Sequence, residues 1–138
     1  MSRVVDSQAL RAAAFAAMAN AHAPYSGLSV GAAIETESGD IVAACNVENA
    51  TYPLGLCAEH AAVAAAVARG ARRFRALAIA TNARVPTPPC GACRQVLCEF
   101  GDDVSITSYA ADGSSAKWTL TQLLPTPFVR DHLQKSRQ

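Results

Sequence analysis

The sequence has little charge. Asp, Glu, Lys and Arg together make up 17% of its 138 residues, whereas an average soluble domain has about 25%. Hydrophobic residues reach 51%, a share raised by the many alanines. A chain of this length can bury one core, and with so few charges we expect further copies of the chain to cover part of its surface. The composition therefore favours a homo-oligomer.

Long apolar runs are also missing. No segment reaches the roughly 18 apolar residues that a membrane-spanning helix needs, and the stretch Met1–Asp6 lacks the apolar region of a secretory leader. We therefore expect a cytoplasmic protein with no membrane partner. In that compartment, the five cysteines indicate metal binding or catalysis before disulfides.

A basic stripe is the third missing feature. The net charge is +1 and the 12 basic residues are scattered, the densest group being the interrupted cluster Arg69, Arg72, Arg73 and Arg75. Binding to a nucleic-acid backbone relies on clustered positive charge. The sequence therefore argues against a nucleic-acid partner.

The residue pattern predicts one domain, residues 1–138, in which helices and strands alternate. The expected helices are Asp6–Ala21, Cys57–Arg69, Cys90–Phe100 and a last turn over Thr119–Leu124. The expected strands are Leu28–Glu37, Ile41–Asn46, Arg75–Thr81, Val104–Tyr109 and Ala116–Trp118. We expect Pro24 to end the first helix.

The order of these elements predicts the fold class. Helices between the second, third and fourth strands imply parallel crossovers, whereas the turn before the last strand is too short for a crossover helix. We therefore predict an α/β fold, a three-layer α/β/α sandwich with a five-stranded mixed sheet whose last two strands are antiparallel.

Three cysteines form the candidate metal site. Cys57 lies at the start of one predicted helix, and Cys90 and Cys93 lie at the start of another. The partial positive charge of a helix N-terminus favours the thiolate form that binds metal. Three protein ligands leave one position of a zinc ion open to water, as in catalytic zinc sites. We therefore predict one Zn²⁺ per subunit.

Charged neighbours of the three cysteines suggest what the metal is for. Glu59 lies two residues after Cys57, where a carboxylate can take a proton from a zinc-activated water and pass it to a substrate. Three thiolates and Zn²⁺ sum to one negative charge, which helix dipoles offset in part. Arg94, directly after Cys93, is the best-placed cation to offset the rest.

Two other interpretations of the cysteines stay open at this point. A structural zinc site needs a fourth ligand, for which His60, Cys45 or Cys98 are candidates. A single C-x-x-C pair is also compatible with redox chemistry. We expect His60 to point off the metal side of its helix, and Cys45 and Cys98 to be buried as small apolar residues.

At these residues the chain resembles the cytidine deaminase family, over nearly its whole length. The matching segments are Ala23–Ser26, Val30–Ala33, Cys45–Ala50, Tyr52–Gly55, Cys57–Glu59, Pro89–Val96 and Leu123–Pro125 followed by Phe128. The resemblance implies zinc-dependent hydrolysis of cytidine and deoxycytidine to uridine and deoxyuridine, a reaction of pyrimidine salvage. It also implies that Glu59 hydrogen-bonds the ring nitrogen while it moves the proton.

The resemblance further implies the substrate contacts. Asn46 and Glu48 should hydrogen-bond the sugar hydroxyls, and backbone groups near Ala58 and Pro89 should read the pyrimidine edge. Leu28, Tyr52 and Phe128 complete the implied set. Phe128 should reach the site of a neighbouring subunit, because family members of this size are homotetramers with shared active sites.

Two positions depart from the family pattern. His60 stands where the family usually has an arginine that donates to the cysteine sulfurs, so we expect a more electron-rich zinc here, with Arg94 carrying most of the compensation. Leu28 stands where the family usually has an aromatic residue. It keeps an apolar wall without a stacking face, which leaves the breadth of accepted bases open.

Two alternative functions follow from the same residues. One is a related deaminase that acts on a modified cytosine nucleoside, a blasticidin-type antibiotic or a nucleic-acid cytosine. The other is a zinc-stabilised module without turnover, which would have no use for Glu59 beside the metal.

Overall fold

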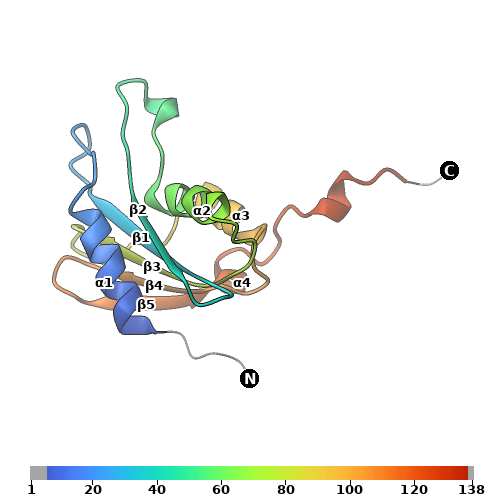
Figure 1. Cartoon of the computed structure of the whole chain (residues 1–138). Coiled ribbons are helices and arrows are strands. Elements are labelled where there is room, and N and C mark those ends of the chain that lie inside the picture. The colour runs from blue at the N-terminus through green and yellow to red at the C-terminus, as the bar shows by residue number, and fades with distance from the viewer. Residues whose placement is uncertain (1–5, 137–138) are drawn as a thin grey trace.

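A five-stranded sheet forms the centre of the protein in a computed structural model, which describes residues 6–136 (Figure 1). The first five and last two residues of the predicted domain lie outside the described range. The strands, in spatial order, are β2 (Ile41–Cys45), β1 (Val30–Thr36), β3 (Phe74–Thr81), β4 (Ser105–Tyr109) and β5 (Ser115–Thr119).

The sheet is mixed, as predicted. β1 pairs antiparallel with both β2 and β3, β3 pairs parallel with β4, and β4 pairs antiparallel with β5. β2, β3 and β4 therefore run in one direction, as the helical crossovers predicted, and the last two strands are antiparallel. The sequence did not predict that β1 separates β2 from β3.

Helices cover both faces of the sheet. α1 (Ser7–Met18) packs on one face, and α2 (Ala58–Ala68) and α3 (Gly91–Cys98) lie on the other. α4 (Leu120–Leu123) is the short last turn that the sequence predicted. The three-layer α/β/α sandwich is confirmed.

Small residues explain how closely α1 approaches the sheet. Its layer of the core consists largely of alanines around Leu10. A Cβ atom at Gly31 of β1 would lie 1.9 Å from the carbonyl oxygen of Ala14 in α1. Only glycine therefore fits at this crossing. The opposite layer has the larger side chains, among them Ile34, Leu77 and Leu97.

The first helix ends earlier than the sequence predicted. Asp6 caps it by accepting a hydrogen bond from the Ala9 amide, and the helix stops at Met18 rather than at Ala21. Pro24 is therefore not what ends it. The chain turns because His22 pairs with the segment after β2, donating to the Asn46 carbonyl at 3.0 Å and accepting from the Glu48 amide at 2.8 Å.

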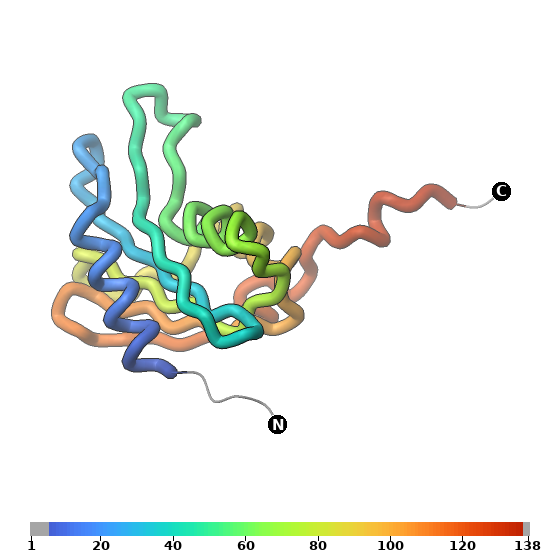
Figure 2. Tube along the Cα trace, viewed as in Figure 1, coloured from blue at the N-terminus to red at the C-terminus, as the bar shows by residue number. Residues whose placement is uncertain are grey.

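Two short 3₁₀ helices fall in segments predicted as irregular, Tyr52–Leu54 and Arg130–Leu133. The first lies at the tip of the loop between β2 and α2. The second lies on the C-terminal segment, which extends away from the body of the protein (Figure 2). Within residues 6–136, no helix has the length and apolar character to cross a bilayer.

Candidate active site and metal centre

Two helix starts bring three sulfur atoms together. Cys57 is the N-cap of α2, Cys90 is the N-cap of α3, and Cys93 lies in the first turn of α3. The Sγ atoms of Cys57 and Cys90 are 4.0 Å apart, and all three Sγ atoms lie within 4.8 Å of one another. Tetrahedral zinc with Zn–S bonds of about 2.3 Å requires sulfur atoms about 3.8 Å apart. The three thiols therefore fit one zinc ion with little adjustment.

The group of possible metal ligands found among residues 6–136 holds three members. His60, Cys45 and Cys98 are not part of the group, which consists of three sulfurs alone among residues 6–136. Two sulfurs are on exposed residues and Cys93 is buried. The site therefore has the open position of a catalytic zinc rather than the closed set of a structural one.

Without a metal, the three thiols share their protons unequally. The thiolate of Cys57 accepts a hydrogen bond from Cys93, which with smaller effects of Cys90 and of the charge of His60 lowers the pKa of Cys57 to about 6. The same hydrogen bond raises the pKa of Cys93, because Cys93 is the donor. The backbone amide of Cys93 also points at the Cys90 sulfur, 3.5 Å away. Negative charge on sulfur is thus supported before any cation binds.

Glu59 is buried beside these sulfurs. Glu59 lies in the first turn of α2 and is 7% exposed. Burial raises the pKa of Glu59 to about 7, and the charge of Cys57 adds to the rise. A carboxyl group that gains and loses its proton near neutrality suits a proton carrier.

A cavity of about 320 Å³ connects this metal centre to the loops above the sheet. Five residues expected to contact substrate line it, namely Leu28, Asn46, Glu48, Tyr52 and Ala58. Cys57, Glu59 and Cys90 of the metal centre line it as well. The structure therefore brings these eight residues to one cavity.

The two expected sugar-binding side chains also hold the loops together. Glu48 accepts hydrogen bonds from the amides of Tyr25 and Ser26 and from the Ser26 hydroxyl. These bonds, that from the hydroxyl above all, lower the pKa of Glu48. Asn46 donates to the Leu28 carbonyl at 2.8 Å and accepts from the Val30 amide at 2.9 Å.

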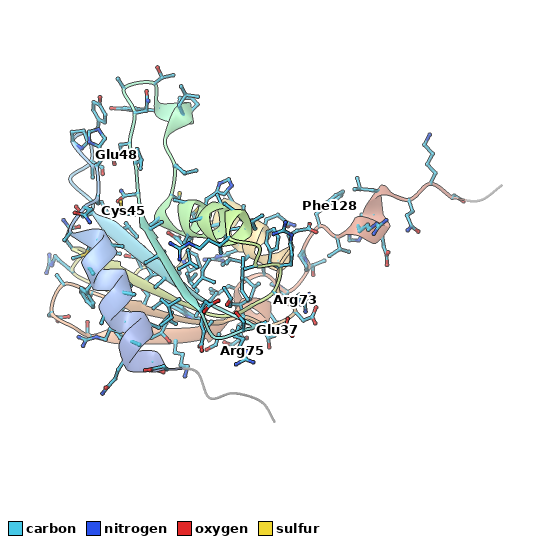
Figure 3. The ribbon with its side chains drawn as sticks, viewed as in Figure 1. Glu37, Cys45, Glu48, Arg73, Arg75 and Phe128 are labelled. Atoms are coloured by element: carbon cyan, nitrogen blue, oxygen red, sulfur yellow. The ribbon has the colours of Figure 1, made fainter. Side chains whose placement is uncertain are left out.

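Phe128 lies away from this cavity. It is 58% exposed on the C-terminal segment, and Figure 3 places it far from Glu48. Gln95, on α3, fixes its backbone by donating to the Phe128 carbonyl and accepting from the Phe128 amide. Within one protomer, therefore, Phe128 does not join the site.

The two residues expected to tune the metal centre differ in their contacts. Arg94 donates to the carbonyl oxygens of Pro89 and Leu123, at 2.8 and 3.0 Å, so that it anchors the loop before Cys90 to the end of α4. His60 is exposed, yet its charge contributes to the lowered pKa of Cys57. His60 thus acts on the sulfurs through space.

Sequence reasoning missed several residues around the cavity. Thr81, Thr87 and Pro88 line it. The Thr87 amide is held by the buried hydroxyl of Ser108 on β4. The proline-rich run before Cys90 was a usable signal for a rigid wall, because proline restricts the residue before it to extended backbone. Nothing in the local sequence marked Ser108, since its partner is 21 residues away.

Comparison with known proteins identifies related chains. The family model described as "Cytidine and deoxycytidylate deaminase zinc-binding region" matches residues 5–108. The cytidine deaminase of Sporosarcina psychrophila is 40% identical over 131 residues, which cover 94% of this chain and 96% of that one. The cytidine deaminase of Mycobacterium tuberculosis H37Rv is 41% identical over 134 residues, covering 97% and 98%. The crystal structure of the Burkholderia pseudomallei cytidine deaminase superposes with a TM-score of 0.84 at 42% identity, covering 88% and 98%.

Proposed function

Because the chain belongs to the cytidine and deoxycytidylate deaminase family, we propose that it hydrolyses cytidine and deoxycytidine. Water adds to C4 of the pyrimidine, the C4–amine bond breaks, and uridine or deoxyuridine leaves with ammonia. The observation that carries the proposal is one cavity lined by zinc-ligand cysteines, by a buried carboxyl group and by polar loop residues. We assign the reaction to the chain as one domain, residues 1–138.

Cys57, Cys90 and Cys93 would hold the zinc ion. When bound, zinc makes water acidic enough to supply a hydroxide nucleophile near neutral pH. Glu59 then serves the proton transfers. It accepts one proton from the water and donates it to the ring nitrogen N3, and it then takes the remaining proton from the hydroxyl group added to C4 and donates it to the leaving amine. Its burial at 7% exposure keeps bulk water from competing for that proton.

The other end of the cavity suits a sugar. Asn46 and Glu48 line it, and both carry oxygens that accept hydrogen bonds from hydroxyl groups. The lowered pKa of Glu48 keeps that side chain an ionised acceptor at neutral pH. Leu28 supplies an apolar wall for the base, Tyr52 a rim, and the backbone at Ala58 a polar contact for the pyrimidine edge.

We assign the assembly as a homotetramer in which Phe128 enters a neighbouring site. Exposed apolar residues support this, because a monomer seldom leaves such side chains in water. They include Tyr52 at 73% exposure, Leu54 at 69% and Leu133 at 71%. Sedimentation of the purified protein would show one species with four times the monomer mass. A stable monomer with full activity would refute shared sites.

The cellular setting follows from the reaction. Free nucleosides are salvaged where nucleotides are made, so we place this chain in cytoplasmic pyrimidine salvage. Fractionation of cells that carry a tagged copy tests the compartment.

The test of the reaction compares four substrates with and without a strong chelator: cytidine, deoxycytidine, blasticidin S and single-stranded DNA. We expect the ultraviolet absorbance change of deamination with cytidine and deoxycytidine and not with the other two substrates. The chelator should abolish this change. Preference for the antibiotic or for DNA would assign a related deaminase instead. Full zinc content with no turnover on any of the four would favour the non-catalytic module.

A further inference from the structure

Two asparagine side chains hold the segment Gly27–Val30 from opposite sides. Asn82 donates to the Gly27 carbonyl at 2.9 Å and accepts from the Ser29 amide at 3.0 Å. Asn46 donates to the Leu28 carbonyl at 2.8 Å and accepts from the Val30 amide at 2.9 Å. Along these four successive residues, the backbone is thus bound in alternation by the side-chain amide of Asn82 and the side-chain amide of Asn46.

This arrangement extends the sheet beyond its strands. Asn46 directly follows β2 and Asn82 directly follows β3, and β1 lies between these two strands. Their main-chain amides still bond to β1 and the residue before it, Asn46 to the Val30 carbonyl and Asn82 to the Ser29 carbonyl. Past that point the side-chain amides replace the main chain. Each has the donor and acceptor of a peptide group, so the ladder pattern continues to Gly27.

The held segment carries a wall of the cavity. Leu28 lies at its centre and lines the cavity together with Asn46 and Glu48. Gly27 turns the chain there with a φ of +73°, a conformation that glycine adopts easily. Asn82 itself is exposed and is not among the residues that line the cavity. Its side-chain hydrogen bonds reach the site through the backbone on either side of Leu28.

We propose that Asn82 is a positioning residue that holds Leu28 against the base and so sets the affinity for the nucleoside. The proposal rests on the proposed deaminase function. Without the Asn82 side chain, the Gly27 carbonyl and the Ser29 amide lose their hydrogen bonds on the β3 side, and Leu28 samples positions that do not close the cavity. The chemical step is unaffected, because the sulfurs and Glu59 are on other elements.

The experiment compares Asn82→Ala with the wild type and with Asn20→Ala, a control in the exposed turn after α1. Loss of two hydrogen bonds is expected to raise the KM for cytidine roughly tenfold. The kcat and the zinc content should stay close to the wild-type values. Asn82→Asp keeps the acceptor and loses the donor, so its KM should rise as well. The control should match the wild type.

A double-mutant comparison tests that the effect runs through Leu28. In a Leu28→Ala background there is no wall to position, so Asn82→Ala should leave KM unchanged there. An equal rise in both backgrounds, or a fall in kcat without a change in KM, overturns the proposal.

Amide hydrogen exchange separates this proposal from the proposed function. Asn82→Ala should speed exchange at the Ser29 amide and leave the amides of α2 unchanged, whether or not the protein deaminates cytidine. Unchanged exchange at Ser29 refutes the clamp. Faster exchange in an active enzyme with unchanged KM refutes its role in binding. An inactive wild type with faster exchange in the variant refutes the function alone.

Discussion

The two ends of the cavity are built in different ways. The metal end comes from the first turns of α2 and α3, and its key groups lie within four residues of each other in each helix. Cys93 and Glu59 there are 2% and 7% exposed. The end proposed to bind the sugar, called the sugar end below, comes from loops whose parts are joined by side-chain hydrogen bonds, such as that from Ser26 to Glu48, 22 residues apart. Helix geometry thus positions the groups proposed for the reaction, and long-range polar contacts position those proposed to bind the sugar.

This difference predicts that substitutions at the metal end reduce turnover and that those at the sugar end weaken binding. The largest effect is expected for Glu59→Gln, which keeps size and burial and removes the proton carrier. The kcat for cytidine should fall by roughly a hundred- to ten-thousandfold, with zinc content unchanged by elemental analysis. Glu99→Gln, at the exposed end of α3, is the matched control. Wild-type turnover in Glu59→Gln would remove the carboxyl group from the mechanism.

A smaller effect is expected for Glu48→Gln, at the sugar end. One carboxylate oxygen becomes a donor facing Ser26, so the loop loosens and the KM should rise by roughly tenfold with kcat nearly constant. Glu37→Gln is its control, at the opposite end of the sheet in Figure 3. A fall in kcat with constant KM would mean that the two ends are not separate.

The pH dependence of the contact between Glu48 and Ser26 sharpens the same point. The folded protein holds the pKa of Glu48 below its usual 4.5, because Ser26 bonds to the ionised form. The contribution of ionised Glu48 to the stability of the folded protein is therefore complete above pH 4.5, and it is lost as the pH falls through the lowered pKa of Glu48. Hydrogen exchange of the Ser26 amide should therefore show constant protection from neutral pH down to about 4.5, with a loss only in more acidic solution.

The smallest effect is expected for His60→Arg. A permanent cation close to Cys57 offsets the charge of the sulfurs more fully than histidine does, so turnover should rise a few-fold or the pH optimum should shift. His60→Gln, which removes the charge, should change the profile in the opposite sense. Identical pH–rate profiles for all three proteins would show that His60 only fills space.

The same division decides what the sequence could predict. Cys57, Cys90, Cys93 and Glu59 were found from local spacing, because a helix start places neighbours in sequence on one site. The strands and helices were predicted from hydrophobic periodicity, which is also a pattern of residues close together in sequence. Asn82 and Gln95 were missed because their partners, Gly27 and Phe128, are 55 and 33 residues away. The end of α1 was misplaced because pairing of His22 with the β2 loop, a distant contact, decides it.

X-ray absorption at the zinc edge of the purified protein tests the central claim most directly. Three sulfur neighbours at about 2.3 Å and one oxygen neighbour at about 2.0 Å are expected, because in the proposed site three thiolates would bind the ion and water would take the fourth position. A fourth sulfur or a histidine nitrogen in place of that oxygen, or fewer than three sulfurs, would contradict it.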